Sequence, residues 1–197
     1  MGIESQLQRI NSGIARCDNT ITQLLDFSRS RQVIANRDDF DSWLEKIVSE
    51  EVQRLPVSVL VNCKLGLDGL AVAFDAARMQ RAVANLISNA SEAMVGNGEE
   101  SSKYTTTNPT ITISSVRDGD SIIVRISDNG PGIKPEDLER IREPLFTTKN
   151  FGTGLGLPAV EQILVQHGGS LAVTSTLGAG ASFIMRFPIA GTEELAA

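Results

Sequence analysis

The chain has 197 residues, of which 41% are hydrophobic and 21% charged, and its formal net charge is −6. These values predict a globular protein with one ordinary domain and an appendage, and the absence of a basic cluster argues against nucleic acid as a partner. No apolar run reaches membrane-spanning length and no signal peptide opens the chain, so we expect a cytoplasmic location, with a parent protein that could still be membrane-anchored.

The first segment predicts a long helix. Its apolar residues recur at alternating steps of four and three, which is the a/d seam of a heptad repeat. They are Ile3, Leu7, Ile10, Ile14, Cys17, Ile21 and Leu24. An amphipathic helix lying on its own domain is one explanation, but so regular a heptad favours a helix from a bundle and a homodimer formed through it. Residues 28–39, rich in Arg, Asn and Asp, predict a linker.

Helices and strands then alternate. We predict helices from about Asp39 to the residues before Pro56, from Asp75 to about Met94, and from Leu155 to His167. Strands are expected at residues 57–61, 70–74, 111–115, 122–126, 170–175 and 181–187, with a flexible loop at 96–108 and a long connection at 128–154. This order predicts a two-layer α+β sandwich with a largely antiparallel sheet over residues 37–197, preceded by the helix and linker at 1–36.

Cysteine and histidine are too few to predict a disulfide or a zinc cluster. Cys17 and Cys63 lie far apart in unlike contexts, and we expect both to be small apolar core residues. His167 is the only histidine, and its His-Gly-Gly context predicts the end of a helix.

Two asparagines stand out in the helix at 75–94. Asn85 and Asn89 are four residues apart and therefore share one face. Asparagine is a poor residue in the middle of a helix, so a pair on one face needs a reason. An amide oxygen is a suitable ligand for Mg²⁺. Taken alone, however, hydrogen bonds from these amides to neighbouring backbone are the simpler explanation.

The segment Asp128-Asn129-Gly130-Pro131-Gly132 follows a predicted strand. Its glycines allow sharp turns and let a ligand approach the backbone closely. A carboxylate at the strand end could accept a hydrogen bond from an exocyclic amine such as that of adenine. By itself this motif indicates only a turn.

A third segment, Gly152-Thr153-Gly154-Leu155-Gly156-Leu157, opens a predicted helix. Backbone N–H groups at such a helix start form a site for phosphates. The spacing is unlike a true dinucleotide fingerprint, because the preceding strand and parallel repeats are missing.

Together with Glu143-Pro-Leu-Phe146-Thr-Thr-Lys149, these segments resemble the ATP-binding domain shared by histidine kinases, gyrase, Hsp90 and mismatch-repair ATPases. Residues 85–92 resemble its N box, 128–132 its G1 box, Phe146 its F box and 152–156 its G2 box. The Glu-Pro-Leu-Phe-Thr-Thr-Lys phrase is most similar to the nitrogen-regulation-like sensor kinases. The resemblance covers about residues 38–190 and implies the Bergerat-type fold, with ATP and Mg²⁺ as ligands.

The resemblance also implies roles for individual residues. Asn89 would coordinate Mg²⁺, with Asn85 supporting the metal or triphosphate, and Asp128 would bind the adenine amine. Lys149 would contact phosphate, whereas Glu92 stands where many kinases carry a basic or aromatic residue. The other implied cofactor-binding residues shape the base pocket, the lid or its hinge: Gly130, Gly132, Phe146, Thr148, Gly152, Gly154, Leu155, Gly156 and Ser182.

One position favours phosphoryl transfer over hydrolysis. The ATPases that this chain resembles place a water-activating glutamate one turn before the metal-binding asparagine, and here that residue is Asn85. Residues 9–29, ending in Leu-Leu-Asp-Phe-Ser, resemble the second helix of the kinase dimerisation hairpin. The resemblance therefore implies a sensor histidine kinase fragment whose phosphoacceptor histidine lies outside this sequence, because His167 at a helix end is a poor acceptor.

The implied partners are a histidine-bearing helix of the parent chain, a second copy of the chain, and the receiver domain of a response regulator. Two other interpretations of the sequence stay open. The chain could be a nucleotide-binding module without kinase activity, either split or degenerate. It could also be an anti-sigma-type serine kinase, which would act on a protein serine and would not need the heptad helix.

Overall fold

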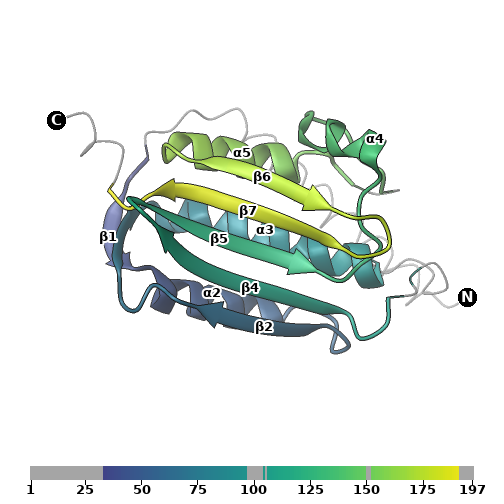
Figure 1. Ribbon diagram of the computed structural model, residues 1–197, viewed down its shortest axis with the longest axis horizontal. Helices are drawn as coiled ribbons and strands as arrows, with labels where there is room; N and C mark the ends of the chain where they lie inside the picture. Colours follow the sequence, from purple (N-terminus) through teal and green to yellow (C-terminus); the bar gives the residue numbers. More distant parts are fainter. Residues whose placement is uncertain (1–32, 97–103, 105, 150–151, 191–197) are drawn as a thin grey trace, which may run out of the picture.

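The computed structural model describes residues 33–96, 104, 106–149 and 152–190. In chain order the elements are β1 (Asn36–Asp39), α2 (Phe40–Val52), β2 (Leu60–Leu65), β3 (Ala71–Phe74), α3 (Ala76–Val95), β4 (Thr110–Asp118), β5 (Ser121–Asp128), α4 (Pro135–Leu138), the 3₁₀ helix η2 (Arg140–Arg142), α5 (Gly156–Gln166), β6 (Ser170–Ser175) and β7 (Ala181–Pro188). Helices α2, α3 and α5 lie together behind one face of a five-stranded sheet (Figure 1). This confirms the predicted two-layer α+β sandwich. Within the described ranges, no helix is both long and apolar enough to span a bilayer.

Two of the helices covering the sheet begin at an aspartate cap. Asp39 accepts a hydrogen bond from the backbone N–H of Ser42 at the start of α2, and Asp75 accepts one from the N–H of Arg78 at the start of α3. Beyond the caps, apolar side chains recur three or four residues apart on the face that meets the sheet. In α3 these buried residues are Met79, Ala82, Val83, Leu86, Ile87, Ala90 and Met94. Full burial stabilises each large apolar side chain by roughly 1.5–3 kcal/mol, which fixes the rotation of α3 about its axis.

The sheet order is β2-β4-β5-β7-β6, with β2 parallel to β4 and all other neighbours antiparallel. Side chains alternate between its faces, so β5 turns Ile122, Val124 and Ile126 towards the helices. The same alternation carries Asp128, the last residue of β5, onto the buried face beneath α3. An acidic side chain is thereby placed on the apolar side of the sheet.

Several local predictions need correction. The strand predicted at 57–61 is β2 at Leu60–Leu65, which pairs with β4, whereas β3 pairs with β1 in a separate two-stranded sheet. Strand β1 lies in the stretch predicted as linker, and α4 and η2 lie in the predicted long connection. Cys63 is exposed on the edge strand β2 rather than buried in the core. The predicted N-terminal helix, Cys17 and most of the predicted loop at 96–108 lie outside the described residues.

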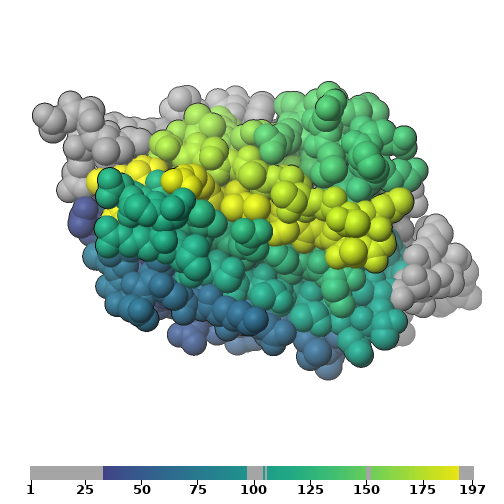
Figure 2. All heavy atoms as spheres, in the orientation of Figure 1, coloured from purple at the N-terminus to yellow at the C-terminus, as the bar shows by residue number. Residues whose placement is uncertain are grey.

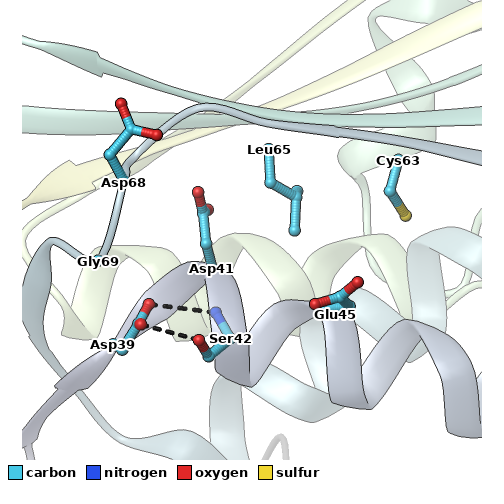
Figure 3. A pocket seen from close by; sticks show the side chains of 8 residues that line it. All are labelled: Asp39, Asp41, Ser42, Glu45, Cys63, Leu65, Asp68 and Gly69. Atoms are coloured by element: carbon cyan, nitrogen blue, oxygen red, sulfur yellow. Dashed lines mark hydrogen bonds between the residues drawn. The ribbon is translucent and has the colours of Figure 1, made fainter.

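An acidic hollow lies between α2 and the β2–β3 connection (Figure 3). Two of its carboxylates make hydrogen bonds that stabilise the fold. Asp39 caps α2, and Asp41 accepts hydrogen bonds from the backbone N–H of Leu67 at 2.7 Å and from the hydroxyl of Ser115 at 2.5 Å. These bonds tie the β2–β3 connection to α2 and to β4. Among the described residues, no group of three or more histidine, cysteine or acidic side chains could hold a metal ion.

Candidate nucleotide-binding site

A pocket of about 640 Å³ lies between α3, the end of β5, residues 131–149 and the start of α5. Ten of the predicted site residues line it: Asn85, Asn89, Asp128, Gly132, Phe146, Thr148, Lys149, Gly152, Gly154 and Gly156. In the space-filling view, the chain around α4 stands next to the turn that joins β6 to β7 (Figure 2). A hydrogen bond from the N–H of Gly178 to the carbonyl of Pro131 at 2.7 Å ties these two segments together. The fold therefore brings motifs that are far apart in sequence to one cavity.

Asp128 forms one end of the pocket, where only 9% of its surface is exposed. Its Oδ1 atom accepts hydrogen bonds from the N–H groups of Gly130 at 2.9 Å and Ala181 at 3.3 Å. Burial raises the pKa of the Asp128 carboxyl, and the backbone hydrogen bonds oppose that rise. The result is a buried acceptor that is held in a fixed orientation.

Glycines allow backbone to pack on backbone around Asp128. Gly180 has φ +93°, and a Cβ atom there would overlap the Asp128 carbonyl group. Gly132 has φ +72°, and its Cβ would overlap the carbonyl group of Thr176. A side chain at either position would therefore push apart the strand ends that orient the carboxylate.

Asn85 and Asn89 form the opposite end, facing the start of α5. A Cβ atom on Gly156, the first residue of α5, would lie 3.7 Å from Asn89 Nδ2 and 4.0 Å from Asn85 Oδ1. Because Gly156 adjoins both asparagines, the first backbone N–H groups of α5 lie beside the two amides. No side chain caps this helix start. This combination offers both hydrogen-bond donors for an anion and amide oxygens for a cation.

Lys149 reaches across the pocket to α3. Its Nζ atom donates hydrogen bonds to Asn89 Oδ1 at 2.9 Å and to Glu92 Oε2 at 2.6 Å. The hydroxyl of Ser88 donates to the other Glu92 oxygen at 3.0 Å. The ammonium group of Lys149 already lies against Asn89, the predicted metal ligand. The oxygens of Asn89 and Glu92 that accept its hydrogen bonds are a donor set that fits Mg²⁺. The sequence alone indicates no role for Glu92, and in the structure it is the ionic partner of Lys149.

The segment before α5 is anchored at two points. The N–H of Leu145, a residue with φ +69°, donates to the carbonyl of Gly154 at 3.0 Å. The guanidinium of Arg140 in η2 lies 4.2 Å from the centre of the Phe146 ring. Phe146 thus connects η2 to the pocket wall.

Three predicted residues do not line the pocket. Gly130 and Leu155 are buried beside it. Ser182 lies on the other face of β7, where its hydroxyl is 2.8 Å from that of Ser127, so it does not line the pocket. The alternation of buried residues along β7 brings Ala181 into the pocket instead. That alternation was readable from the sequence.

His167 is buried at the C-terminal end of α5 and does not line the pocket. Its Nδ1 bonds the carbonyl of Ile163 at 2.7 Å, and its Nε2 accepts from the N–H of Asp75 at 3.0 Å. Burial lowers the pKa of the His167 imidazole. Gly168, with φ +69°, ends the helix as expected. With both ring nitrogens engaged, His167 packs the helix ends together.

The fold and the pocket define a class of ATP-binding domain. The family model described as "Histidine kinase-, DNA gyrase B-, and HSP90-like ATPase" matches residues 74–191, and the chain belongs to this family.

Within it, the relatives are sensor histidine kinases. Sensor histidine kinase ZraS of Salmonella typhi is 30% identical over 183 residues, which cover 91% of this chain and 37% of that protein. Sporulation kinase C of Bacillus subtilis is 28% identical over 91% of this chain and 40% of its own length. The chain thus spans less than half of these relatives.

Solved structures agree with the predicted fold. The catalytic domain of histidine kinase ThkA, in a nucleotide-free form, matches with a TM-score of 0.65 and 26% identity, over 79% of this chain and 96% of that domain. Full-length ShkA in complex with AMPPNP matches with a TM-score of 0.78 over 96% of this chain and 39% of that chain. At 19% identity, the ShkA match shows the fold alone.

Proposed function

We propose that this chain is the ATP-binding catalytic part of a two-component sensor histidine kinase. It binds ATP with Mg²⁺ and transfers the γ-phosphoryl group to a histidine outside this sequence, for relay to an aspartate of a response regulator. The proposal rests on one observation, which is that the two ends of one pocket carry different chemical groups. A fixed, buried carboxylate lies at one end, and two amides, a lysine and a helix start lie at the other.

The Asp128 end binds the adenine. Both hydrogen bonds from the backbone go to Oδ1, so Oδ2 is the oxygen that accepts from the exocyclic amine. Apolar lining residues such as Ile133, Leu157 and Phe183 suit the faces of a purine. A buried carboxylate in apolar surroundings discriminates well, because a base without the amine leaves it unpaired.

The Asn89 end holds the phosphates and the metal. Asn89 and Asn85 supply amide oxygens, Lys149 supplies a positive charge, and the start of α5 supplies N–H groups. Mg²⁺ bound there would neutralise charge on the phosphate oxygens. In the nucleotide complex Lys149 exchanges its bonds to Asn89 and Glu92 for phosphate oxygens, which frees Asn89 for the metal.

The proposed transfer needs no base from this chain to activate water. The bond from the γ-phosphorus to its bridging oxygen breaks and ADP leaves with that oxygen, while a new bond forms to an imidazole nitrogen whose ring then releases a proton. Asn85, one turn before Asn89, is a weak base, which supports transfer to histidine over hydrolysis. His167 is unsuited as the acceptor because it is buried with both nitrogens bonded.

The acceptor histidine belongs to a helix hairpin of the parent protein, and residues 1–36 supply its second helix and a linker to the catalytic domain at 37–197. That helix also joins two copies of the protein. The structural neighbours include ThkA in complex with the response regulator TrrA, at 22% identity and a TM-score of 0.76. A receiver domain is the partner that we propose here.

Two experiments test the proposal in sequence. Calorimetric titration with MgATP should show binding to this chain and a loss of affinity in Asp128→Asn. A separate histidine-bearing hairpin and γ-labelled ATP are then added, and acid-labile label should appear on the hairpin. Binding without transfer would support a nucleotide-binding module, and label on a protein serine would support the serine kinase. Absence of MgATP binding to the wild type would contradict all three.

A further inference from the structure

Tyr104 is the only tyrosine of the chain, and it lines the pocket although it lies outside every recognised motif. Its ring lies against Gly96, the residue that ends α3 with φ +77°. A Cβ atom on Gly96 would stand 2.8 Å from Tyr104 Cζ and 2.9 Å from Cδ2. The lack of a side chain at Gly96 therefore creates the space in which this half-buried aromatic ring sits.

The position of Gly96 along α3 shows which end of the pocket Tyr104 borders. Gly130, beside Asp128, lies close to α3 near its C-terminus, since its Cβ would be 3.1 Å from Met94 Cγ. Gly96 follows Met94 by two residues. Asn85 and Asn89 lie one to three turns further back, towards the start of α5. Tyr104 thus lies nearer than Asn85 and Asn89 do to the end of α3 that adjoins Asp128.

Between Asn89 and Gly96, α3 lines the pocket with Glu92 and Ala93. Ala93 is small and lies on the same side of the helix as Asn89 and Gly96, whereas the Glu92 carboxylate is bonded to Lys149. An aromatic ring that is half-buried at the wall of a pocket can cover a flat apolar ligand with one face. Here that ligand would be the sugar-and-base portion of a nucleotide.

We propose that Tyr104 is a nucleotide-contacting residue that covers the adenosine portion of ATP at the mouth of the pocket. This inference rests on the proposed function and extends it to a residue that no motif contains. The ring contributes through its face and edge rather than through its hydroxyl, because stacking on an aromatic side chain tolerates any base.

The single tyrosine permits a direct test by fluorine NMR. Chain labelled with 3-fluorotyrosine gives one tyrosine resonance, which should shift on addition of MgATP or MgADP. Inorganic tripolyphosphate with Mg²⁺, which occupies only the phosphate end, should leave it unshifted. In calorimetry, Tyr104→Ala should weaken MgADP binding by roughly tenfold, while Tyr104→Phe stays within about twofold of wild type. Val165→Ala, an exposed position on α5 outside the pocket, serves as the control and should bind as wild type.

The outcomes separate this inference from the function on which it rests. If calorimetry shows MgADP binding but the resonance does not move and Tyr104→Ala binds normally, the assignment of Tyr104 is overturned and the ATP site stands. If wild-type chain binds no nucleotide, the proposed function fails, and the Tyr104 assignment fails with it. The fluorine measurement needs no substitution, so it remains decisive even if Tyr104→Ala lowers the stability of the domain.

Discussion

At the Asp128 end of the pocket, backbone atoms set the geometry, whereas at the Asn89 end long side chains set it. Asp128 is held by two backbone N–H groups, and Gly180 packs directly on its carbonyl. Lys149 instead reaches Asn89 and Glu92 through a flexible stem that is 37% exposed. The first arrangement is part of the folded core, and the second can rearrange without unfolding anything.

The difference suits the proposed reaction. An adenine base is the same before and after phosphoryl transfer, so a rigid site suits it. The triphosphate changes its charge and length in the reaction, and the groups around it must follow. Substitutions at the first end should therefore alter stability and binding together, and substitutions at the second end should alter binding almost alone.

The sharpest test of that division uses two glycines of the β6–β7 turn. Gly180→Ala should lower the free energy of unfolding by about 2–5 kcal/mol and abolish ATP binding, because the new methyl overlaps the Asp128 backbone at a positive φ. Gly178 also has a positive φ, +81°, but a Cβ there would meet no atom within 4 Å. Gly178→Ala should lose only about 1–2 kcal/mol and keep its affinity. Urea unfolding and calorimetry compare the two; equal effects would mean that the packing on Asp128 is unimportant.

The next largest effect is expected from Asp128→Asn, which should weaken ATP binding by about 10- to 100-fold through loss of a hydrogen bond to a charged acceptor. A triphosphate of purine riboside, which lacks the amine, should bind the wild type and the variant equally weakly. If Asp128→Asn discriminates between ATP and purine riboside triphosphate as well as the wild type does, Asp128 does not bind the exocyclic amine.

Asp128→Asn should lose affinity for ATP without losing stability. Because burial raises the Asp128 pKa in the folded protein, the native state binds a proton more tightly than the unfolded chain does, and the contribution of Asp128 to stability falls as pH rises from about 4 through its folded-state pKa. Asp128→Asn removes that penalty and should be at least as stable at pH 7. Its advantage over wild type should shrink as pH falls, which urea unfolding at several pH values will show.

The Asp128 end was largely predictable from the sequence, and the reason is local. Glycines beside a strand end and the two-residue alternation of β5 are both written in the chain, and they fix Asp128 on the inner face. The same alternation applied to β7 would have selected Ala181 over Ser182.

What could not be predicted depends on contacts between distant segments. The pairing of Lys149 with Glu92 spans 57 residues, and nothing in either local pattern indicates it. Likewise, β1 is a strand because it pairs with β3, which lies more than 30 residues further along the chain. The polar sequence of the segment alone indicates a linker. Cys63 is exposed because β2 is an edge strand, a property of sheet order rather than of sequence.

At the Asn89 end, the two members of one ion pair should behave oppositely. Lys149→Ala should weaken MgATP binding by up to about tenfold, since it removes a charge-assisted contact to phosphate. Glu92→Gln should tighten binding of ATP without metal, because Lys149 is no longer held away from the phosphates. The pair is partly exposed, so either change should alter the free energy of unfolding by less than about 1 kcal/mol. Calorimetry with and without Mg²⁺ gives the signs, and weaker metal-free binding in Glu92→Gln would contradict the exchange.

The smallest effect is expected at His167, which joins the far ends of α3 and α5 and touches neither end of the pocket. Its pKa is lowered by burial, so the unfolded chain takes up a proton before the native state does, and stability should fall as pH decreases below about 6.5. His167→Gln can keep one donor and one acceptor in the same space. It should lose about 1 kcal/mol at pH 7 and show a weaker pH dependence between pH 5 and 7. Nucleotide affinity and transfer to a supplied histidine should both persist in this variant, because the residue supports the two helices without reaching the ligand. A loss of transfer with normal ATP binding would contradict this expectation. It would indicate that His167 takes part in the chemistry and is not only a structural residue.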